Sequence, residues 1–398
     1  MVAAVLSGHS PSYRPLLSII SLRDRLVSNL STFQRRLAVR CLHRQGRYGA
    51  VLTGFAWLGA LPVAFAVAAE PTPARQYENR LTPVKNPGPI LADYPDFVQP
   101  LKESKRFFAP PVIDDAQADL TVRCWRYSYN ARGVVEMRNR LRADATAVIV
   151  VHPWGVDDTQ GWQSPEPAGV AFFCTPEKNQ VCRRHVEKVV NPFLKALRGK
   201  AALTMYSLPG KEDPIRKKLY RSFGGSPSTA ERQAGAKELA AKLKSFSYRG
   251  DQLPEKLSLS AETPAADYFR QFPGLDAGAK YNNEGFWDLP IPVIKEIDVD
   301  PEDVVIYDGD GYPALRDYFK KQKIRHVLLA GYCTDMCLCS TTAGYENLRQ
   351  DFNVMVVGDA TLATFPGTDS PAAATSTALA FASLKVLITQ VSWVKADK

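Results

Sequence analysis

Continuous apolar runs alternate with amphipathic stretches along the chain from residue 119 onward. Short apolar runs suit strands that are buried on both faces, and the stretches between them repeat with the period of a helix. Strands are predicted at 147–151, 202–206, 303–307, 326–330 and 354–357, and helices at 181–197, 312–321, 337–349 and 371–389. The alternation predicts a three-layer α/β/α fold, in which a Rossmann-like parallel sheet lies between two layers of helices.

Residues 119–398 are therefore predicted to form one domain, with additions around its first strands. Alternating residues at 120–129 and 134–137 flank a turn and predict a β-hairpin before the core. Residues 71–118 are rich in proline and predict an extended arm or linker that lies over the surface. Residues 208–290 form a longer insertion than a simple crossover needs, which predicts a lid or a subunit contact more readily than a separate catalytic domain.

Residues 1–70 are predicted to be a leader. Residues 1–49 contain eight arginines and one acidic residue, Asp24, so they supply most of the net charge of +9. Because the remainder is close to neutral, the charge does not indicate a nucleic-acid partner. Residues 50–69 are uncharged and end in small residues, which predicts a signal peptide and export to the periplasm or the cell exterior. A retained membrane anchor and an organelle transit peptide are the alternatives for this leader.

The cysteines and histidines do not predict a metal site. Cys333, Cys337 and Cys339 lack the paired spacing that zinc sites use. The sequence also lacks a glycine-rich phosphate loop, a dinucleotide fingerprint and an HExxH motif, so no metal or cofactor is expected. Cys174 and Cys182 allow two alternatives, a disulfide across a short polar loop in an exported protein or two free buried thiols.

A reactive cysteine is predicted just beyond the strand at 326–330. The segment after this strand has the pattern of a polar elbow and then a helix with Cys337 in its first turn. The unpaired N–H groups and partial positive charge of a helix N-terminus favour thiolate over thiol, so Cys337 is the candidate nucleophile. Thr334 is expected to cap this helix, and the amides of the elbow are expected to bind developing negative charge. Asp335 is expected to be structural, because its charge would oppose a thiolate.

The spacing around Cys337 is similar to that of a known family. The run Gly331-x-x-Thr334-Asp335-x-Cys337-Leu338-x-x-Thr341, followed by the strand at 354–357 and by Gly358-Asp359-Ala360, resembles the isochorismatase-like cysteine hydrolases. The resemblance implies attack by the cysteine on amides or related carbon centres, assisted by an aspartate that ends the first strand and a lysine after a later strand. It also implies a homo-oligomer and a cis peptide between Tyr332 and Cys333.

The chain departs from the family pattern at both supporting positions. His152 stands where the family has the aspartate, and Tyr307-Asp308-Gly309-Asp310 stands where it has the lysine. In one hypothesis His152 is the base for Cys337, and Asp308 or Asp310 fixes its tautomer, because imidazole exchanges protons readily near neutral pH. In the other hypothesis the triad has been lost, and the fold serves as a catalytically inactive ligand-binding or scaffold protein.

A pocket with aromatic and acidic side chains is predicted around these residues. Parallel strands end at the same edge of the sheet, so the residues that follow them gather there. The candidate substrate-binding residues are Trp154, Asp157, Asp158, Tyr307, Asp310, Tyr332, Cys333 and Thr334. Such a pocket suits a small amine, amide or hydroxylated molecule better than a phosphate, so a small amide-like substrate is expected. Lys211 is a candidate to replace the missing lysine from another strand end.

Overall fold

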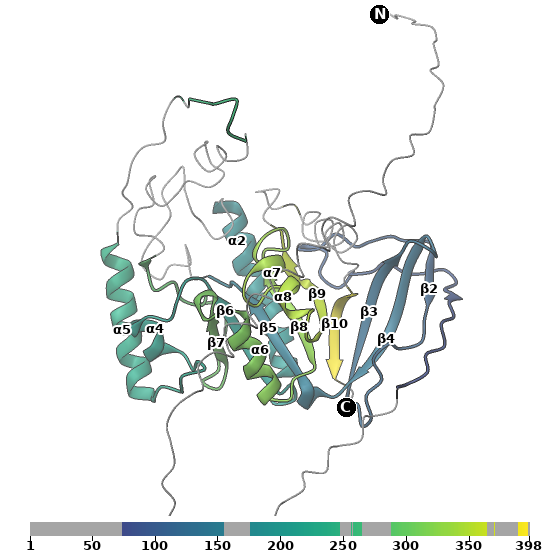
Figure 1. Cartoon of the computed structure of the whole chain (residues 1–398), viewed down its shortest axis with the longest axis horizontal. Helices are drawn as coiled ribbons and strands as arrows, with labels where there is room; N and C mark the ends of the chain where they lie inside the picture. Colours follow the sequence, from purple (N-terminus) through teal and green to yellow (C-terminus); the bar gives the residue numbers. More distant parts are fainter. Residues whose placement is uncertain are drawn as a thin grey trace, which may run out of the picture. The chain divides into compact units, whose positions relative to one another are not determined.

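The computed structural model describes residues 74–154, 176–246, 256, 258–264, 288–363, 370 and 389–396 of the 398-residue chain. The described residues all belong to the second of the chain's two units, Ala74–Lys398 (Figure 1). The predicted signal peptide and membrane anchor lie outside the described residues, so they stay predictions, as does export. Within the described ranges, no helix has the length and apolar character needed to span a membrane.

A ten-stranded sheet runs through the second unit (Figure 1). Its strands are β1 (Thr82–Pro83), β2 (Arg106–Phe108), β3 (Leu120–Ser128), β4 (Gly133–Leu141), β5 (Thr146–Val151), β6 (Leu203–Leu208), β7 (Val304–Tyr307), β8 (His326–Tyr332), β9 (Asn353–Leu362) and β10 (Thr389–Ala396). Their spatial order is β1-β2-β4-β3-β10-β9-β8-β5-β6-β7, and each neighbouring pair from β10 to β7 is parallel. This arrangement confirms the predicted parallel α/β sheet.

The N-terminal hairpin is confirmed, and it extends the same sheet. β3 and β4 pair antiparallel from Leu120↔Leu141 to Ser128↔Gly133. β3 also pairs antiparallel with β10, a strand that the sequence analysis did not predict. The helix predicted at 371–389 falls almost entirely outside the described residues, so its outcome is open. Through β10, the hairpin becomes continuous with the parallel strands.

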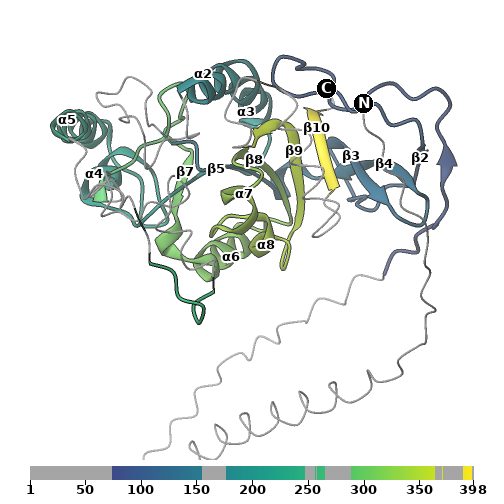
Figure 2. The same ribbon diagram turned by 90° about the horizontal axis from the view of Figure 1, so that it is seen from above.

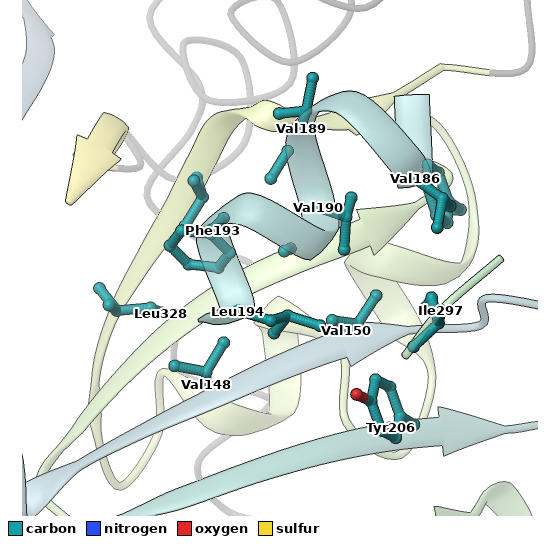
Figure 3. Packing of buried hydrophobic residues seen from close by; sticks show 14 of the residues in the cluster. Val148, Val150, Val186, Val189, Val190, Phe193, Leu194, Tyr206, Ile297 and Leu328 are labelled. Carbon is teal, nitrogen blue, oxygen red and sulfur yellow. The ribbon is translucent and has the colours of Figure 1, made fainter. Parts of the chain in front are cut away.

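Helices cover both faces of the parallel part of the sheet, as predicted (Figure 2). One layer contains α2 (Pro176–His185), a π-helical turn (Val186–Val190) and α3 (Asn191–Leu197), and the other contains α6 (Tyr312–Lys321), α7 (Cys337–Ser340) and α8 (Tyr345–Leu348). In Figure 3, Phe193 and Leu194 of α3 lie over Val148 and Leu328 of the sheet. Each layer buries its own apolar cluster, so the sheet is the central layer of three.

The described part of the insertion contains a pair of helices beyond β7. These are α4 (Pro214–Leu219) and α5 (Thr229–Ser245) (Figures 1 and 2). α5 begins with a capping box between Ser228 and Glu231. Gly235 allows the close approach of α4, since a Cβ there would lie 2.9 Å from the Cβ of Lys218. The predicted role of the insertion as a lid or subunit contact stays a prediction.

The continuous helix predicted at 337–349 is broken in the structure. α7 ends at Ser340, and α8 begins only at Tyr345. Thr341 has extended backbone angles, and its hydroxyl donates to the carbonyl of Cys337 at 2.9 Å. The prediction was wrong because a threonine side chain competes with backbone amides for helix carbonyls and here ends the first helical segment.

The proline-rich arm contributes to the core of the domain. Ile90, Leu91, Phe97 and Val98 are buried in the apolar cluster that also contains α2 and α3. Near the end of the arm, the carboxylate of Asp115 lies 2.9 Å from Nε2 of His326, at the start of β8. The arm is therefore a packed part of the domain rather than a bare surface linker. Its apolar residues stand at irregular positions along the sequence and show no helical or strand period.

Candidate active site

The candidate nucleophile lies on an elbow between β8 and α7. The Tyr332–Cys333 peptide is cis, as the sequence resemblance implied. The carbonyl of Cys333 accepts hydrogen bonds from the amides of Met336 (3.0 Å) and Leu338 (3.1 Å). Cys337 lies between these two residues and is half-buried, and its own amide has no hydrogen-bond acceptor among the described residues. The elbow thus holds Cys337 from both sides and leaves one N–H donor beside it.

Close packing of β8 against β5 brings the elbow beside His152. Val151 pairs with Gly331, so the residues that follow these two positions leave the sheet next to each other. Gly331 has a φ of 100°, and a Cβ there would lie 2.4 Å from the carbonyl oxygen of Val151. Glycine alone fits both the backbone angle and the contact.

His152 has an unusual backbone conformation at the end of β5. Its φ is 45°, in the left-handed region that residues other than glycine seldom occupy. Its amide donates to the carbonyl of Ser207 at 2.9 Å, which ties the turn to β6. Such a conformation costs about 1–2 kcal/mol, and residues that are held in it often belong to functional sites.

The imidazole of His152 pairs with Asp308 and is influenced by Cys337. Its Nε2 lies 3.0 Å from Oδ2 of Asp308, which follows β7. This is an ion-pair distance rather than an aligned hydrogen bond, since neither ring nitrogen has a partner in hydrogen-bond geometry among the described residues. Burial disfavours the charged ring, but the interactions with Asp308 and Cys337 outweigh burial and raise the pKa of His152 to about 9. His152 is therefore charged at neutral pH, next to the candidate nucleophile.

Asp308 is held in place by Thr342, which the sequence analysis missed. The amide of Thr342 donates to Oδ1 of Asp308 at 3.3 Å, and its hydroxyl donates to the carbonyl of Asp308 at 2.9 Å. Thr342 lies in the break between α7 and α8, within the segment that was predicted as one helix. The pair of threonines at 341 and 342 was the signal in the sequence that this helix is interrupted.

Asp310 closes its own turn instead of reaching His152. Its Oδ2 accepts a hydrogen bond from the amide of Tyr307 at 2.9 Å. Burial raises the pKa of Asp310, and nearby carboxylates add to this effect. The ring of Tyr307 is itself buried beneath the guanidinium of Arg216, which lies 4.6 Å from the ring centroid. Of the two aspartates that the sequence offered as partners for His152, the structure brings Asp308 to it.

Trp154 is another predicted binding residue that adjoins this group. Its ring is buried, and its centroid lies 5.8 Å from that of His152. Asp157 and Asp158 lie outside the described residues, so their predicted role in binding stays a prediction.

Tyr332 and Cys333 contact the α2 layer. Tyr332 is fully buried, and its hydroxyl lies 2.8 Å from Nδ1 of His185 in α2. Lys178 of α2 is also buried, and burial lowers its pKa, an effect that Cys333 and Asp335 oppose. Sequence reasoning missed both basic residues, because a single lysine or histidine on a helix usually faces solvent. They show that the elbow is packed from the side opposite α7 as well.

Two parts of the predicted activation of Cys337 were wrong. α7 has four residues, so its dipole is too short to supply the expected positive charge. Its N-cap is Met336, without a side-chain cap, while the hydroxyl of Thr334 is buried and has no hydrogen-bond partner in the described ranges. His152, whose pKa is raised by Asp308 and Cys337, is instead the basic side chain next to Cys337.

The remaining candidates lie around this group. The side chain of Lys211 packs over Gly309, where a Cβ would lie 2.2 Å from Cγ of Lys211. Cys182 is a free and buried thiol, whereas Cys174 lies outside the described residues. The described part of the chain contains no cluster of three or more histidine, cysteine, aspartate or glutamate side chains that would hold a metal ion.

Comparison with known proteins gives a family match over residues 287–386, which fit the isochorismatase domain. This range contains β7, the elbow and β9. No curated protein matches the sequence at a significant level.

Solved structures show a weaker similarity over a longer part of the chain. A cysteine hydrolase from Pseudomonas syringae pv. phaseolicola 1448A is 14% identical, with 63% of this chain and 90% of that chain covered and a TM-score of 0.31. An isochorismatase-like hydrolase from Alkaliphilus metalliredigens is 12% identical, with 62% and 93% covered and a TM-score of 0.32. A nicotinamidase/pyrazinamidase from Bacillus subtilis is 12% identical, with 62% and 99% covered and a TM-score of 0.29. At these values the structures carry no argument about activity.

Proposed function

The chain is a divergent member of the isochorismatase-like family, and from this premise we propose that it is a cysteine hydrolase of small amide-like substrates. The observation that carries the proposal is the ion pair of His152 with Asp308, in a ring whose pKa is also raised by Cys337. These three residues supply a nucleophile, a proton donor and an orienting carboxylate, which are the parts that covalent hydrolysis requires.

The two supporting charges have exchanged places relative to the pattern that the resemblance implies. That pattern has an anion after the first strand and a cation after the later strand. Here the cation His152 follows β5 and the anion Asp308 follows β7. The pair therefore still offers one positive and one negative group beside Cys337, and the proton now moves through the imidazole.

In the first half of the reaction, Cys337 forms an acyl-enzyme. The raised pKa of His152 favours a resting pair of thiolate and imidazolium. The sulfur attacks the carbonyl carbon, a C–S bond forms, and the carbonyl electron pair moves onto oxygen. The amide of Cys337 donates to this oxyanion. When the C–N bond breaks, His152 gives its proton to the leaving nitrogen, and the amine departs.

In the second half, water releases the acyl group. Neutral His152 takes a proton from the water as its oxygen attacks the thioester carbon. The C–S bond then breaks, the carboxylic acid leaves, and the thiolate and imidazolium are restored. Asp308, which Thr342 holds in place, stabilises the imidazolium in both halves.

The surroundings of this group favour a small, neutral or amine-bearing substrate. Trp154 offers an apolar surface beside His152. Asp308 and Asp310 place carboxylates at the same edge of the sheet, and their charge disfavours a phosphate. The alternative function, a family member that binds a ligand without catalysis, requires no contact between a charged histidine and the cysteine. That contact favours the enzyme.

The test is to trap the acyl-enzyme. The full chain is incubated with a panel of small primary amides and quenched in acid. It is then digested, and the masses of its peptides are measured by mass spectrometry. We expect ammonia release together with a thioester adduct on Cys337, retained in Cys339→Ser and absent in Cys337→Ser. An amide that binds to the protein but gives neither adduct nor ammonia would favour the non-catalytic alternative.

A further inference from the structure

His185 connects several parts of the domain behind the elbow. It is fully buried at the end of α2. Its Nδ1 lies 2.8 Å from the hydroxyl of Tyr332, and its Nε2 lies 2.6 Å from the carbonyl oxygen of Asp359 in β9. The ring of Phe97, from the arm, packs against it at a centroid distance of 5.3 Å. Both nitrogens of this imidazole are therefore bonded, one of them to the last residue of β8.

The partners of His185 determine the direction of both hydrogen bonds. A carbonyl oxygen only accepts, so Nε2 carries the proton and donates to Asp359. In the neutral ring Nδ1 then has a lone pair, and the hydroxyl of Tyr332 donates to it. Burial, the largest effect, lowers the pKa of His185 to about 4, so the ring stays neutral near physiological pH. The arrangement is thus fixed, in contrast to the charged ring of His152.

Tyr332 connects this anchor to the nucleophile. Cys333 follows it directly, and the carbonyl of Cys333 accepts from the amides of Met336 and Leu338, the two neighbours of Cys337. A displacement of the Tyr332 ring would shift the single acceptor that holds both of these amides. His185 belongs to the α2 layer, whereas Cys337 packs against the apolar cluster on the opposite face of the sheet. Any effect of His185 on Cys337 is therefore transmitted through the elbow.

We propose that His185 is a positioning residue for Cys337 and acts through the hydroxyl of Tyr332. The proposal rests on the proposed function, because it requires the distance between Cys337 and His152 to set the reactivity of the thiol. The attraction between a thiolate and an imidazolium weakens as the two separate. A loosened elbow therefore weakens this attraction, and Cys337 should react more slowly with an alkylating reagent.

The test separates the two hydrogen bonds of His185 with a pair of substitutions. His185→Asn keeps an acceptor near the position of Nδ1, and His185→Gln keeps a donor near that of Nε2. Both lose the contact with Phe97, so each is the matched control for the other. Tyr332→Phe and the double variant with His185→Gln complete a cycle. The probe is iodoacetamide, with the labelling rate of Cys337 followed by mass spectrometry between about pH 5 and pH 10 and folding monitored by thermal unfolding.

We expect His185→Gln and Tyr332→Phe to lower the labelling rate at pH 7 by about tenfold and to move the pH midpoint of labelling upward. The double variant should match Tyr332→Phe, because that substitution already removes the hydrogen bond to His185, together with the interaction of the Tyr332 hydroxyl with Cys182. His185→Asn should label like the wild type. A fall in melting temperature with an unchanged pH midpoint in all variants would reduce His185 to a structural residue and overturn the proposal.

Failure of the proposed function gives a different result. If wild-type Cys337 labels no faster than a free thiol, the thiolate site does not exist, and this inference is lost with it. A second outcome refutes only the role of His185. In it, Cys337 of the wild type labels rapidly, His152→Ala abolishes the rapid labelling, and His185→Gln and Tyr332→Phe label at the wild-type rate.

Discussion

At the scale of single residues, two buried histidines are tuned in opposite directions. His152 meets a carboxylate and a thiol, which outweigh burial and raise its pKa to about 9. His185 meets a hydroxyl and a carbonyl, so burial prevails and its pKa falls to about 4. The chemistry of each ring therefore follows from its neighbours, and the sequence alone assigned a role only to the first.

The titration of His152 is the first prediction at this scale. In wild type, NMR of the imidazole should give a pKa of about 9, and Asp308→Asn should lower it by about one unit or more, because the stabilising charge is lost. The folded value lies above the ordinary 6.5 of the unfolded chain. The pair therefore contributes its full stability below about pH 6.5 and loses it as the pH rises through about 9.

Asp308→Asn should accordingly lower the free energy of unfolding more at about pH 6 than at about pH 10. Thermal unfolding of wild type and Asp308→Asn at the two pH values checks this. A wild-type His152 that titrates near its ordinary value, or a substitution effect that grows with pH, would contradict the ion pair.

The hydroxyl of Thr342 gives a second prediction. Thr342→Val removes the hydrogen bond to the carbonyl of Asp308 while keeping the shape of the side chain, and a cost of about 1 kcal/mol is expected. Because the position of Asp308 also changes, the pKa of His152 should fall in the same variant. Thr342→Ser retains the hydroxyl and is the control. Equal NMR titrations of His152 in both variants would show that Thr342 does not position Asp308.

At the scale of elements, the site depends on how closely β8 approaches β5. Gly331→Ala would place a Cβ 2.4 Å from the carbonyl oxygen of Val151 and force an unfavourable φ of 100° on alanine. Backbone atoms cannot yield as a flexible side chain does, so destabilisation by more than about 1 kcal/mol is expected. Gly224→Ala, where the nearest atom is the Ser222 hydroxyl at 3.6 Å, should change stability by less than about 0.5 kcal/mol. Urea unfolding of both variants measures the difference, and equal values would refute the steric account.

The sequence predicted the parts of the site that depend on strand ends. Apolar runs identified β5, β7 and β8, and the shared carboxyl edge then placed His152, Asp308 and Cys337 together. The sequence did not predict the break after α7. Threonine also occurs within helices, and the hydrogen bond from the Thr341 hydroxyl to the carbonyl of Cys337 is seen only in the structure. The hydrogen bond between His185 and Tyr332 could not be predicted either, since it joins residues that are 147 positions apart in the sequence.

At the scale of the whole molecule, the arm belongs to the domain that contains the candidate site. Leu91 is buried against Gly358 of β9, where a Cβ would lie 2.9 Å from one of its methyl carbons. The sequence suggested an extended arm or linker because residues 71–118 contain nine prolines and their apolar residues show no regular period. Burial of the few apolar residues depends on long-range packing, which no local pattern in the sequence records.

Leu91→Ala tests this contribution of the arm. Removing a buried leucine side chain should cost about 2–5 kcal/mol. Leu81→Ala, in the same arm but 42% exposed, should cost less than about 0.5 kcal/mol. Denaturant unfolding of the two variants gives the comparison. Equal and small effects would show that the arm is a separate, weakly attached segment.

The central claim is that His152 and Cys337 form a thiolate–imidazolium pair. The most direct measurement is the rate of Cys337 alkylation by iodoacetamide at about pH 6, in wild type and in His152→Ala. His326→Ala is the control, because it also removes a buried histidine but lies at the start of β8, far from the elbow. The account predicts fast labelling in wild type and His326→Ala, and a fall to the rate of a free thiol in His152→Ala. Labelling that is equally slow in all three proteins would contradict the claim and favour a binding protein without a reactive cysteine.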